Sequence, residues 1–198
     1  MRAVVRELIE TVILALLIFL ALQFSVQNFR VEGSSMQPTL EEGQYILVNK
    51  LLYLRFDPQD ILRFLPFIDS DRTNLLFPIS SPERGEVIIF HFPRDPSRDF
   101  VKRVIGEPGD TVEIKRGTVF INDVELDEPY ITRSDRGSMA PLDIGENEYF
   151  VLGDNRRASN DSRDWGAVPA KLVIGKAWVN YWPLEQIRTL STFLSWPF

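Results

Sequence analysis

Cysteine is missing from this 198-residue chain, and histidine occurs only once, as His91. The lack of cysteine excludes disulfides, thiolate metal sites and a cysteine nucleophile. A single histidine excludes a histidine-rich metal cluster, and the Asp and Glu residues follow no recognisable cation-binding loop pattern. We therefore predict a protein that works without a metal ion or cofactor.

Positive charge is also scarce. There are 22 Lys and Arg residues against 28 Asp and Glu residues, which gives a net charge of −6. Nucleic acid binding needs clustered Lys and Arg to neutralise phosphates, and no such cluster occurs. Nucleic acid is therefore excluded as the main partner.

Hydrophobic residues make up 44% of the chain, which is typical of a globular protein. The length and this composition suit one well-cored domain, or one core with a small satellite.

Residues 11–29 contain no charged side chain and are mostly apolar. At about 1.5 Å per residue, a helix of this length spans the roughly 30 Å hydrocarbon core of a bilayer. A cleaved signal peptide would need a small-x-small site after the run, which Gln23-Phe-Ser-Val-Gln27 does not provide, and a buried core helix is the other alternative. We predict an uncleaved transmembrane anchor.

Basic residues before the anchor indicate its orientation. Arg2 and Arg6 favour a short cytoplasmic N-terminus at 1–10, although Arg30 on the other side weakly opposes this. The rest of the chain would then lie outside the cytoplasm, with its main domain at 30–183.

Short β-type runs with turn signals between them dominate the chain after the anchor. Lys115-Arg-Gly117, for example, separates the two halves of a predicted hairpin. We expect a mainly β protein with folded antiparallel sheets or a partly open barrel, and a smaller β-rich excursion at about 107–147 whose part from 127 is polar and turn-rich. The predicted strands lie at 42–50, 84–93, 100–106, 111–114, 118–121, 124–126 and 149–152.

Two apolar segments follow neither a helix nor a strand pattern. Residues 54–82 mix Phe and Leu with four prolines, and they would either dip into a membrane interface or pack on the core. Residues 184–198 form an apolar C-terminal tail, whose end at 189–198 is too short to span a membrane but suited to lie on one.

A candidate nucleophile lies in Gly33-Ser-Ser-Met-Gln-Pro-Thr-Leu40, directly after the anchor. Gly33 allows the backbone to approach a ligand, and Pro38 stiffens the chain after the two serines. A serine beside a glycine is commonly just part of a turn. A catalytic role therefore requires a base elsewhere in the chain.

His91 and Lys102 are the candidate bases. His91 lies between two phenylalanines in a predicted strand, where a structural imidazole is the usual outcome. Lys102 lies in the apolar run 100–106, where burial would lower its pKa from about 10.4 and leave an amine able to take a proton from a serine hydroxyl. The sequence favours Lys102, although a side chain pointing outward beside Arg103 would be an ordinary solvated lysine.

Four separated stretches of the chain form a recognisable set, and Arg84-Gly-Glu-Val87 is a further block that goes with them. The four stretches are the anchor, Gly33–Leu40, Phe100-Val-Lys-Arg-Val-Ile-Gly106 with Pro108-Gly-Asp110, and Gly153-Asp-Asn-Arg156 with Ser159, Asp161-Ser-Arg163 and Gly166. Together they resemble the bacterial type I signal peptidases, membrane-bound Ser/Lys proteases that remove signal peptides. The resemblance covers most of the chain from Thr11 to Pro183.

The resemblance implies a role for individual residues. Ser35 is the nucleophile, its backbone amide contributes to an oxyanion hole, and Lys102 is the general base. Ser159 matches a serine that hydrogen-bonds the lysine amine, and Asp161 and Arg163 match residues that brace the site. Some members carry a hydroxyl where this chain has Gly33, so a second oxyanion donor from that side chain is excluded.

The resemblance also implies the partners, which are exported preproteins and the lipid bilayer. The enzyme would sit in the cell membrane, or an equivalent internal membrane, with its catalytic domain on the outer face, where sharing a membrane raises the effective substrate concentration. Signal peptides carry small residues at the first and third positions before the cut, which shallow apolar pockets would select. By resemblance and proximity, the walls of these pockets are Phe29, Val31, Met36, Leu40 and Val101.

Two other interpretations stay open from the sequence. A self-cleaving repressor-type Ser/Lys protease has a related catalytic arrangement, but it gives no reason for residues 11–29 or for the block that starts at Gly153. A membrane-anchored β domain that only binds partners would use the same motifs as turns. Activity lost on S35A or K102A substitution separates an enzyme from such a scaffold.

Overall fold

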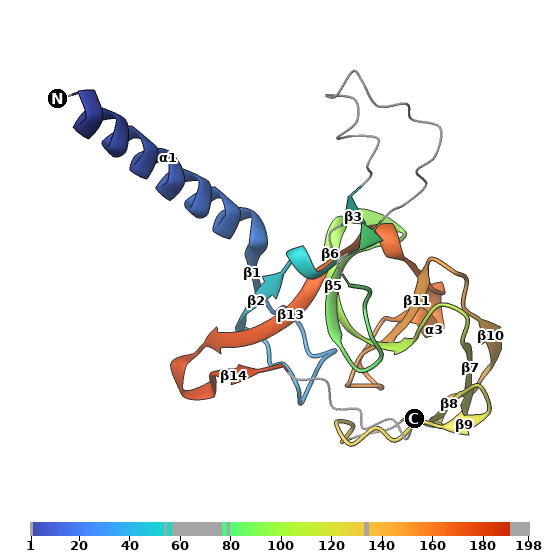
Figure 1. The fold of residues 1–198 in the computed structure, drawn as a ribbon. Coiled ribbons are helices and arrows are strands. Elements are labelled where there is room, and N and C mark those ends of the chain that lie inside the picture. The colour runs from blue at the N-terminus through green and yellow to red at the C-terminus, as the bar shows by residue number, and fades with distance from the viewer. Residues whose placement is uncertain (1, 54, 57–76, 79, 133–134, 191–198) are drawn as a thin grey trace, which may run out of the picture.

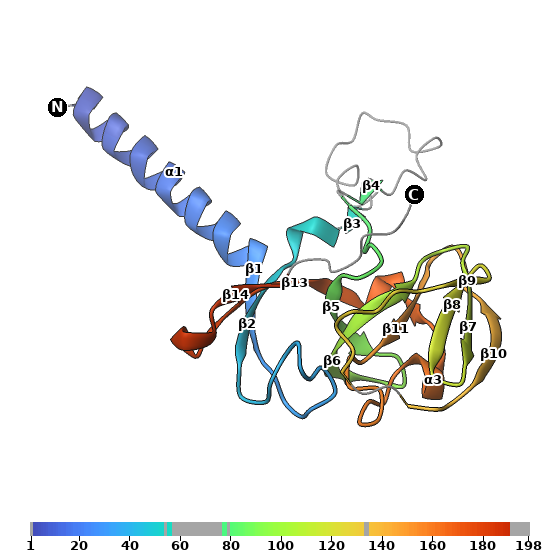
Figure 2. The same ribbon diagram turned by 90° about the horizontal axis from the view of Figure 1, so that it is seen from below.

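The computed structural model describes residues 2–53, 55–56, 77–78, 80–132 and 135–190. Most of the apolar segment predicted at 54–82 and the end of the C-terminal tail therefore lie outside the described residues. The described part consists of one long helix and a β domain with two main antiparallel sheets (Figures 1 and 2). This architecture confirms the predicted mainly β fold class.

Helix α1 (Arg2–Ser25) extends away from the β domain (Figures 1 and 2). Its boundaries differ from the predicted 11–29, because Val26–Arg30 leave the helix and form strand β1, which pairs with β2 (Tyr45–Asn49). Large apolar side chains from Val4 to Leu20 are exposed along the helix.

Among the helices that the structure describes, none has both the length and the apolar character needed to cross a membrane.

The larger sheet has the strand order β1-β2-β13-β5-β6-β11-β12, and β14 pairs with β13. Strand β13 was not predicted, yet it joins the N-terminal strand pair to the rest of the sheet. Gly175 lets β13 lie close to β2, because a Cβ there would meet the Asn49 carbonyl oxygen at 2.5 Å. The remaining strands of this sheet are β5 (Val87–Phe92), β6 (Asp95–Gly106), β11 (Glu148–Leu152), β12 (Val168–Pro169), β13 (Val173–Trp182) and β14 (Arg188–Thr189).

The smaller sheet has the order β10-β7-β8-β9 and forms the predicted excursion. Strands β7 (Thr111–Lys115) and β8 (Thr118–Ile121) make the predicted hairpin, and Gly117 takes the positive φ of +88° that its turn requires. Strand β9 is Val124–Glu125. The polar stretch after residue 127 contains the unpredicted strand β10 (Met139–Asp143), which pairs with β7.

Short elements connect and flank the sheets. Strands β3 (Arg55–Phe56) and β4 (Phe77–Pro78) pair with each other. The short helices are η1 (Leu51–Tyr53), α3 (Ser162–Trp165), η2 (Ala170–Leu172) and η3 (Leu184–Gln186).

Three apolar clusters stabilise the β domain. One lies between the excursion and the larger sheet, around Ile105 and Phe150, and one lies around Phe90 and Tyr149. The third packs beneath the loop that carries the paired serines, and its buried members are Val31, Met36, Leu40, Ile46, Val48, Val87, Ile89, Ala177 and Leu190. The candidate nucleophile is thus attached directly to a core.

Candidate active site

Ser35 lies in a tight turn between β1 and β2. The Gln37 N–H donates to the Ser34 carbonyl at 3.2 Å, and the Leu40 N–H donates to the Met36 carbonyl at 2.8 Å. Gly33 has a φ of +78°, which side chains rarely adopt, so the backbone requires glycine there. Met36 and Leu40 are buried in the core. They hold the turn in place instead of forming the pocket walls that the sequence analysis assigned to them.

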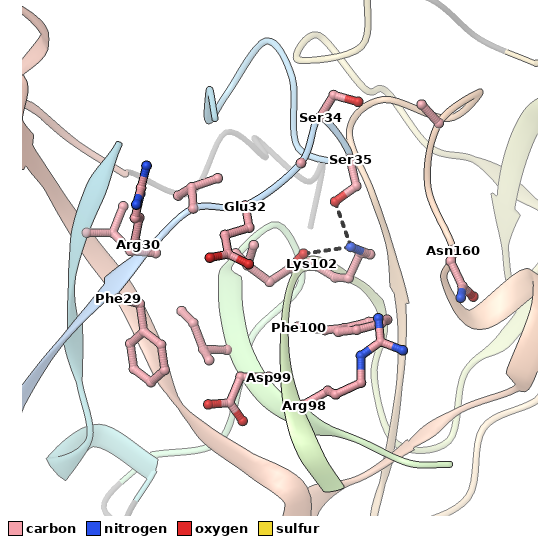
Figure 3. A pocket seen from close by; sticks show the side chains of 16 residues that line it. Phe29, Arg30, Glu32, Ser34, Ser35, Arg98, Asp99, Phe100, Lys102 and Asn160 are labelled. Carbon is pink, nitrogen blue, oxygen red and sulfur yellow. Dashed lines mark hydrogen bonds between the residues drawn. The ribbon is translucent and has the colours of Figure 1, made fainter. Parts of the chain in front are cut away.

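Lys102 reaches the turn from the middle of β6. Its ammonium nitrogen, Nζ, donates to the Ser35 hydroxyl oxygen at 2.8 Å and to the Val101 carbonyl at 2.9 Å (Figure 3). The Lys102 side chain is buried, with a relative exposure of 4%. The alternative of an outward-pointing lysine is therefore wrong, because the strand register turns this side chain toward the serine.

Burial also sets the charge of Lys102. It lowers the pKa of the amine to about 8, while the negative charges of Asp161 and Asp154 act in the opposite direction and raise it. With that pKa, about one amine in ten is neutral at pH 7, compared with fewer than about one in a thousand for a free lysine. A neutral Nζ 2.8 Å from the hydroxyl oxygen can accept its proton.

Ser159 lies beside the pair but does not bond to the amine. Its hydroxyl oxygen is buried and has no hydrogen-bond partner among the described residues. Gly153 allows the two serines to come together, because a Cβ at Gly153 would meet the Ser159 hydroxyl at 2.2 Å and the Ser35 carbonyl oxygen at 2.5 Å. The resemblance placed Ser159 correctly next to the site, while the expected bond to Lys102 is not seen.

Asp161 and Arg163 contact each other and support the loop behind the site. The Arg163 guanidinium donates to both Asp161 carboxylate oxygens, at 2.8 and 2.9 Å. Asp161 also accepts from the Gly153 N–H at 3.1 Å and caps helix α3. Arg163 continues to the Arg156 carbonyl at 2.8 Å and forms an ion pair with Asp135 of the excursion.

A buried ion pair that the sequence analysis missed joins β6 to the same loop. Arg103, adjacent to the candidate base, binds Asp154 through two bonds of 2.8 and 2.6 Å, and the two side chains are 0% and 1% exposed. Arg103 also donates to the Gly85 carbonyl at 2.7 Å, and its guanidinium lies 4.0 Å from the Tyr130 ring centre. The only sequence signal was that both residues lie inside the matching blocks.

Asn155 is a second residue that sequence reasoning missed, because it treated Asp154-Asn155 as a turn former. The Asn155 side-chain amide donates to the Ser34 carbonyl at 3.0 Å, and its backbone N–H donates to the Ser35 carbonyl at 3.0 Å. One residue therefore holds both carbonyls of the paired serines.

A cavity of about 580 Å³ opens in front of Ser35 and Lys102 (Figure 3). It lies between the end of β1 with the serine turn on one side and the first half of β6 on the other. Five residues were expected to form the pocket walls, and three of them, Phe29, Val31 and Val101, line this cavity. The charged and polar residues along it are Arg30, Glu32, Ser34, Arg98, Asp99, Lys102 and Asn160.

His91 faces a different neighbour. Its Nδ1 lies 2.8 Å from the Asp99 carboxylate, across the β5–β6 ladder. Within the described ranges, the side-chain nitrogen that reaches Ser35 is that of Lys102. The described residues also contain no group of three or more His, Cys, Asp or Glu side chains arranged to hold a metal ion.

Several known proteins are similar to this chain in sequence. The family model "Signal peptidase, peptidase S26" matches residues 5–182. A probable signal peptidase I-2 of Synechocystis is 32% identical over 93% of this chain and 77% of the relative. Signal peptidase IB of Staphylococcus aureus is 31% identical over 92% of this chain and 94% of the relative. A solved signal peptidase I of Enterococcus faecalis is 35% identical, covers 49% of this chain and 97% of its own, and superposes with a TM-score of 0.44.

Proposed function

Because the chain belongs to the signal peptidase family, peptidase S26, whose members are serine peptidases that remove signal peptides, we propose that Ser35 and Lys102 are its catalytic pair. The observation that carries the proposal is the 2.8 Å contact between the buried Lys102 amine and the Ser35 hydroxyl, at the wall of an open cavity. The family match over residues 5–182 favours this function over a self-cleaving repressor and over a scaffold.

The pair supports a two-step hydrolysis. The Ser35 oxygen attacks the scissile carbonyl carbon while Lys102 takes the hydroxyl proton, and the resulting ammonium returns that proton to the leaving amine as the C–N bond breaks. An ester between Ser35 and the signal peptide remains. A water molecule then attacks this ester, again giving a proton to Lys102, and the released Ser35 oxygen recovers it.

The Ser35 backbone amide is the proposed oxyanion donor. In the part of the chain that the structure describes, no group accepts a hydrogen bond from this N–H, so it is available to a carbonyl oxygen that gains negative charge. Gly33 supplies no hydroxyl. The amide therefore has a larger share of this stabilisation than in family members that carry a hydroxyl there.

Ser159, Asp161 and Arg163 are proposed to support the pair. Ser159 has a buried hydroxyl next to Gly153 that has no hydrogen-bond partner among the described residues, and a bond from the Lys102 amine would satisfy it. Asp161 keeps the amine from becoming too weak a base, since its charge raises the pKa of Lys102. Arg163 holds Asp161 in place with two hydrogen bonds.

Substrate choice is proposed to come from the apolar part of the cavity. Phe29, Val31 and Val101 lie on its walls, and a shallow apolar pocket formed by them would exclude large side chains by overlap. Preproteins with small residues before the cut are the substrates that this shape admits.

We further propose that α1 holds the enzyme at a membrane, with the N-terminus in the cytoplasm and the β domain on the outer face. Support comes from its exposed apolar side chains, which include Val12, Leu16 and Phe19 at 55–60% exposure, and from its direction away from the β domain (Figures 1 and 2). Apolar surface of this extent is stabilised by lipid.

Cleavage of a preprotein with an Ala-x-Ala site by the detergent-solubilised enzyme tests the proposal. Wild type should cut after the second alanine, and S35A and K102A should each lose at least about 1,000-fold in kcat/KM while remaining folded by circular dichroism. H91A is the matched control and should cleave normally. If K102A cleaves as well as wild type and H91A does not, His91 is the base and the proposed pair is wrong.

A further inference from the structure

The peptide unit between Ser34 and Ser35 is held from one side by Asn155. Its carbonyl accepts the Asn155 side-chain amide at 3.0 Å, as well as the Gln37 N–H at 3.2 Å. The next carbonyl, that of Ser35, accepts the Asn155 backbone N–H at 3.0 Å. Two consecutive carbonyls of the nucleophile turn thus point toward one residue of the following loop.

This arrangement decides where the Ser35 N–H points. The Ser34–Ser35 bond is trans, since the cis bonds of the described chain are the two at Pro38 and Pro183. In a trans peptide the C=O and the next N–H point in opposite directions in one plane. With the Ser34 carbonyl directed at Asn155, the Ser35 N–H is directed away from it.

The side opposite Asn155 is the substrate side. Ser34 and Ser35 line the 580 Å³ cavity in front of the catalytic pair. Asn155 instead lines a separate pocket of about 320 Å³ together with Gln37 and Pro38. The two pockets share no lining residue, so an N–H that points away from Asn155 is directed away from the second pocket, and the cavity lined by Ser34 and Ser35 is the place where a scissile carbonyl would meet it.

Asn155 is itself held rigidly. Its neighbour Asp154 is 1% exposed and forms the buried ion pair with Arg103. On its other side, Arg156 donates to the Gly153 carbonyl at 3.3 Å and pairs with Glu128 of the excursion. A donor fixed on both sides can hold a dipole at a set angle, which is what preorganised stabilisation of an oxyanion requires.

We propose that Asn155 is a positioning residue that aims the Ser35 N–H into the oxyanion hole. The inference rests on the proposed role of Ser35 as nucleophile. Because Gly33 provides no second hydroxyl donor, an error in the direction of this one N–H is poorly compensated. The side-chain amide of Asn155 thus acts on the transition state without touching the substrate.

Two variants test the role of the side chain while leaving the backbone bond to Ser35 in place. N155A removes the amide, and N155D keeps its shape but replaces the donor with a carboxylate oxygen that repels the Ser34 carbonyl. We expect kcat on an Ala-x-Ala peptide to fall about 10- to 100-fold in both, with KM changed less than about twofold. N28D is the control, because it makes the same Asn-to-Asp replacement at an exposed position on β1.

A second readout separates oxyanion alignment from general damage. A peptide aldehyde adds to Ser35 and places an oxyanion in the hole, whereas the cleaved peptide product binds without one. The affinity of the aldehyde should fall in proportion to kcat, and that of the product should stay the same. The pH midpoint of kcat/KM for N155A should also match wild type, because Asn155 does not contact Lys102.

Each contrary outcome has a distinct meaning. Wild-type kcat in both Asn155 variants, or equal losses for aldehyde and product, overturns the positioning role. If S35A retains activity, the proposed nucleophile is wrong as well. If S35A is inert while N155A and N155D are fully active, Ser35 remains the nucleophile and only the positioning role of Asn155 is wrong.

Discussion

At the scale of single residues, the proposed chemistry depends on one amine whose charge is set by opposing effects. Burial of Lys102 favours the neutral form, and the carboxylates of Asp161 and Asp154 favour the charged form. The outcome is a pKa of about 8, close enough to neutrality for the amine both to accept the Ser35 proton and to return it. Without the two carboxylates, burial would lower the pKa of Lys102 further and make the amine a weaker base.

The pH dependence of kcat/KM follows from that pKa. Only the neutral amine is a base, so activity on a short peptide should rise with pH, with a midpoint near 8, and fall about tenfold per pH unit below it. Steady-state assays between pH 6 and pH 10 measure this limb, and H91A should not move it. A limb that disappears in H91A would assign the titration to histidine instead.

At the scale of elements, the catalytic loop after β11 is held between β6 and the excursion. Three arginines make the connections, each to a different part of the excursion. Arg156 pairs with Glu128, the Arg103 guanidinium lies over the Tyr130 ring, and Arg163 pairs with Asp135. The smaller sheet therefore supports the loop that carries Gly153, Asn155 and Ser159, although it contributes no residue to the lining of the main cavity.

The loop after β11 also lies close to the turn that carries Ser35, and Gly153 is the point of contact. In G153A the new methyl would meet the Ser159 hydroxyl and the Ser35 carbonyl at 2.2 and 2.5 Å, so the nucleophile turn must move. We expect a loss of about 1–3 kcal/mol in unfolding free energy and of about 100-fold or more in kcat/KM. Urea unfolding and peptide cleavage measure the two effects.

A glycine in the excursion provides the control for this substitution. A methyl added to Gly137 meets nothing closer than 3.5 Å, so G137A should change neither stability nor activity appreciably. Full activity in G153A would show that the 153–155 loop does not set the position of Ser35.

At the scale of the whole molecule, helix α1 lies apart from the β domain and does not pack along it (Figures 1 and 2). α1 projects outward, and its link to the sheet runs through β1, where the Lys50 N–H donates to the Ser25 carbonyl at 2.9 Å (Figure 2). The catalytic pair, its supporting loop and the cavity all lie within the β domain. Chemistry and membrane attachment are therefore expected to separate experimentally.

Deletion of residues 1–25 tests that separation. The shortened chain keeps β1 and its pairing with β2, so its kcat/KM on a soluble peptide should stay within about twofold of the full chain. Its sedimentation with liposomes should be lost, and cleavage of a preprotein inserted in the same liposomes should fall, because the shared surface no longer concentrates the enzyme. Undiminished liposome binding by the shortened chain would contradict the anchoring role of α1.

Several features could be predicted from local sequence because local physics decides them. The β7–β8 hairpin follows from two alternating runs around a glycine turn, and the strand at Lys102 follows from its apolar neighbours. Strand β10 escaped prediction because Met139–Asp143 carries a proline and only half-buried or exposed side chains. Strand β13 is held by partners far away in sequence, β2 and β5, and no local turn signal marks that pairing.

The amino-acid sequence by itself determined the family and the mainly β class, and it pointed to an apolar N-terminal helix and to Ser35 and Lys102 as the candidate pair, because residue types and their order carry this information. Only the tertiary structure decided which way side chains point. It buried Met36 and Leu40 beneath the turn, directed Lys102 toward Ser35 and put Asn155 behind both serine carbonyls. Those directions depend on strand register and on contacts between residues that are 67 positions apart for Lys102 and Ser35 and 121 for Asn155 and Ser34, which no local pattern specifies.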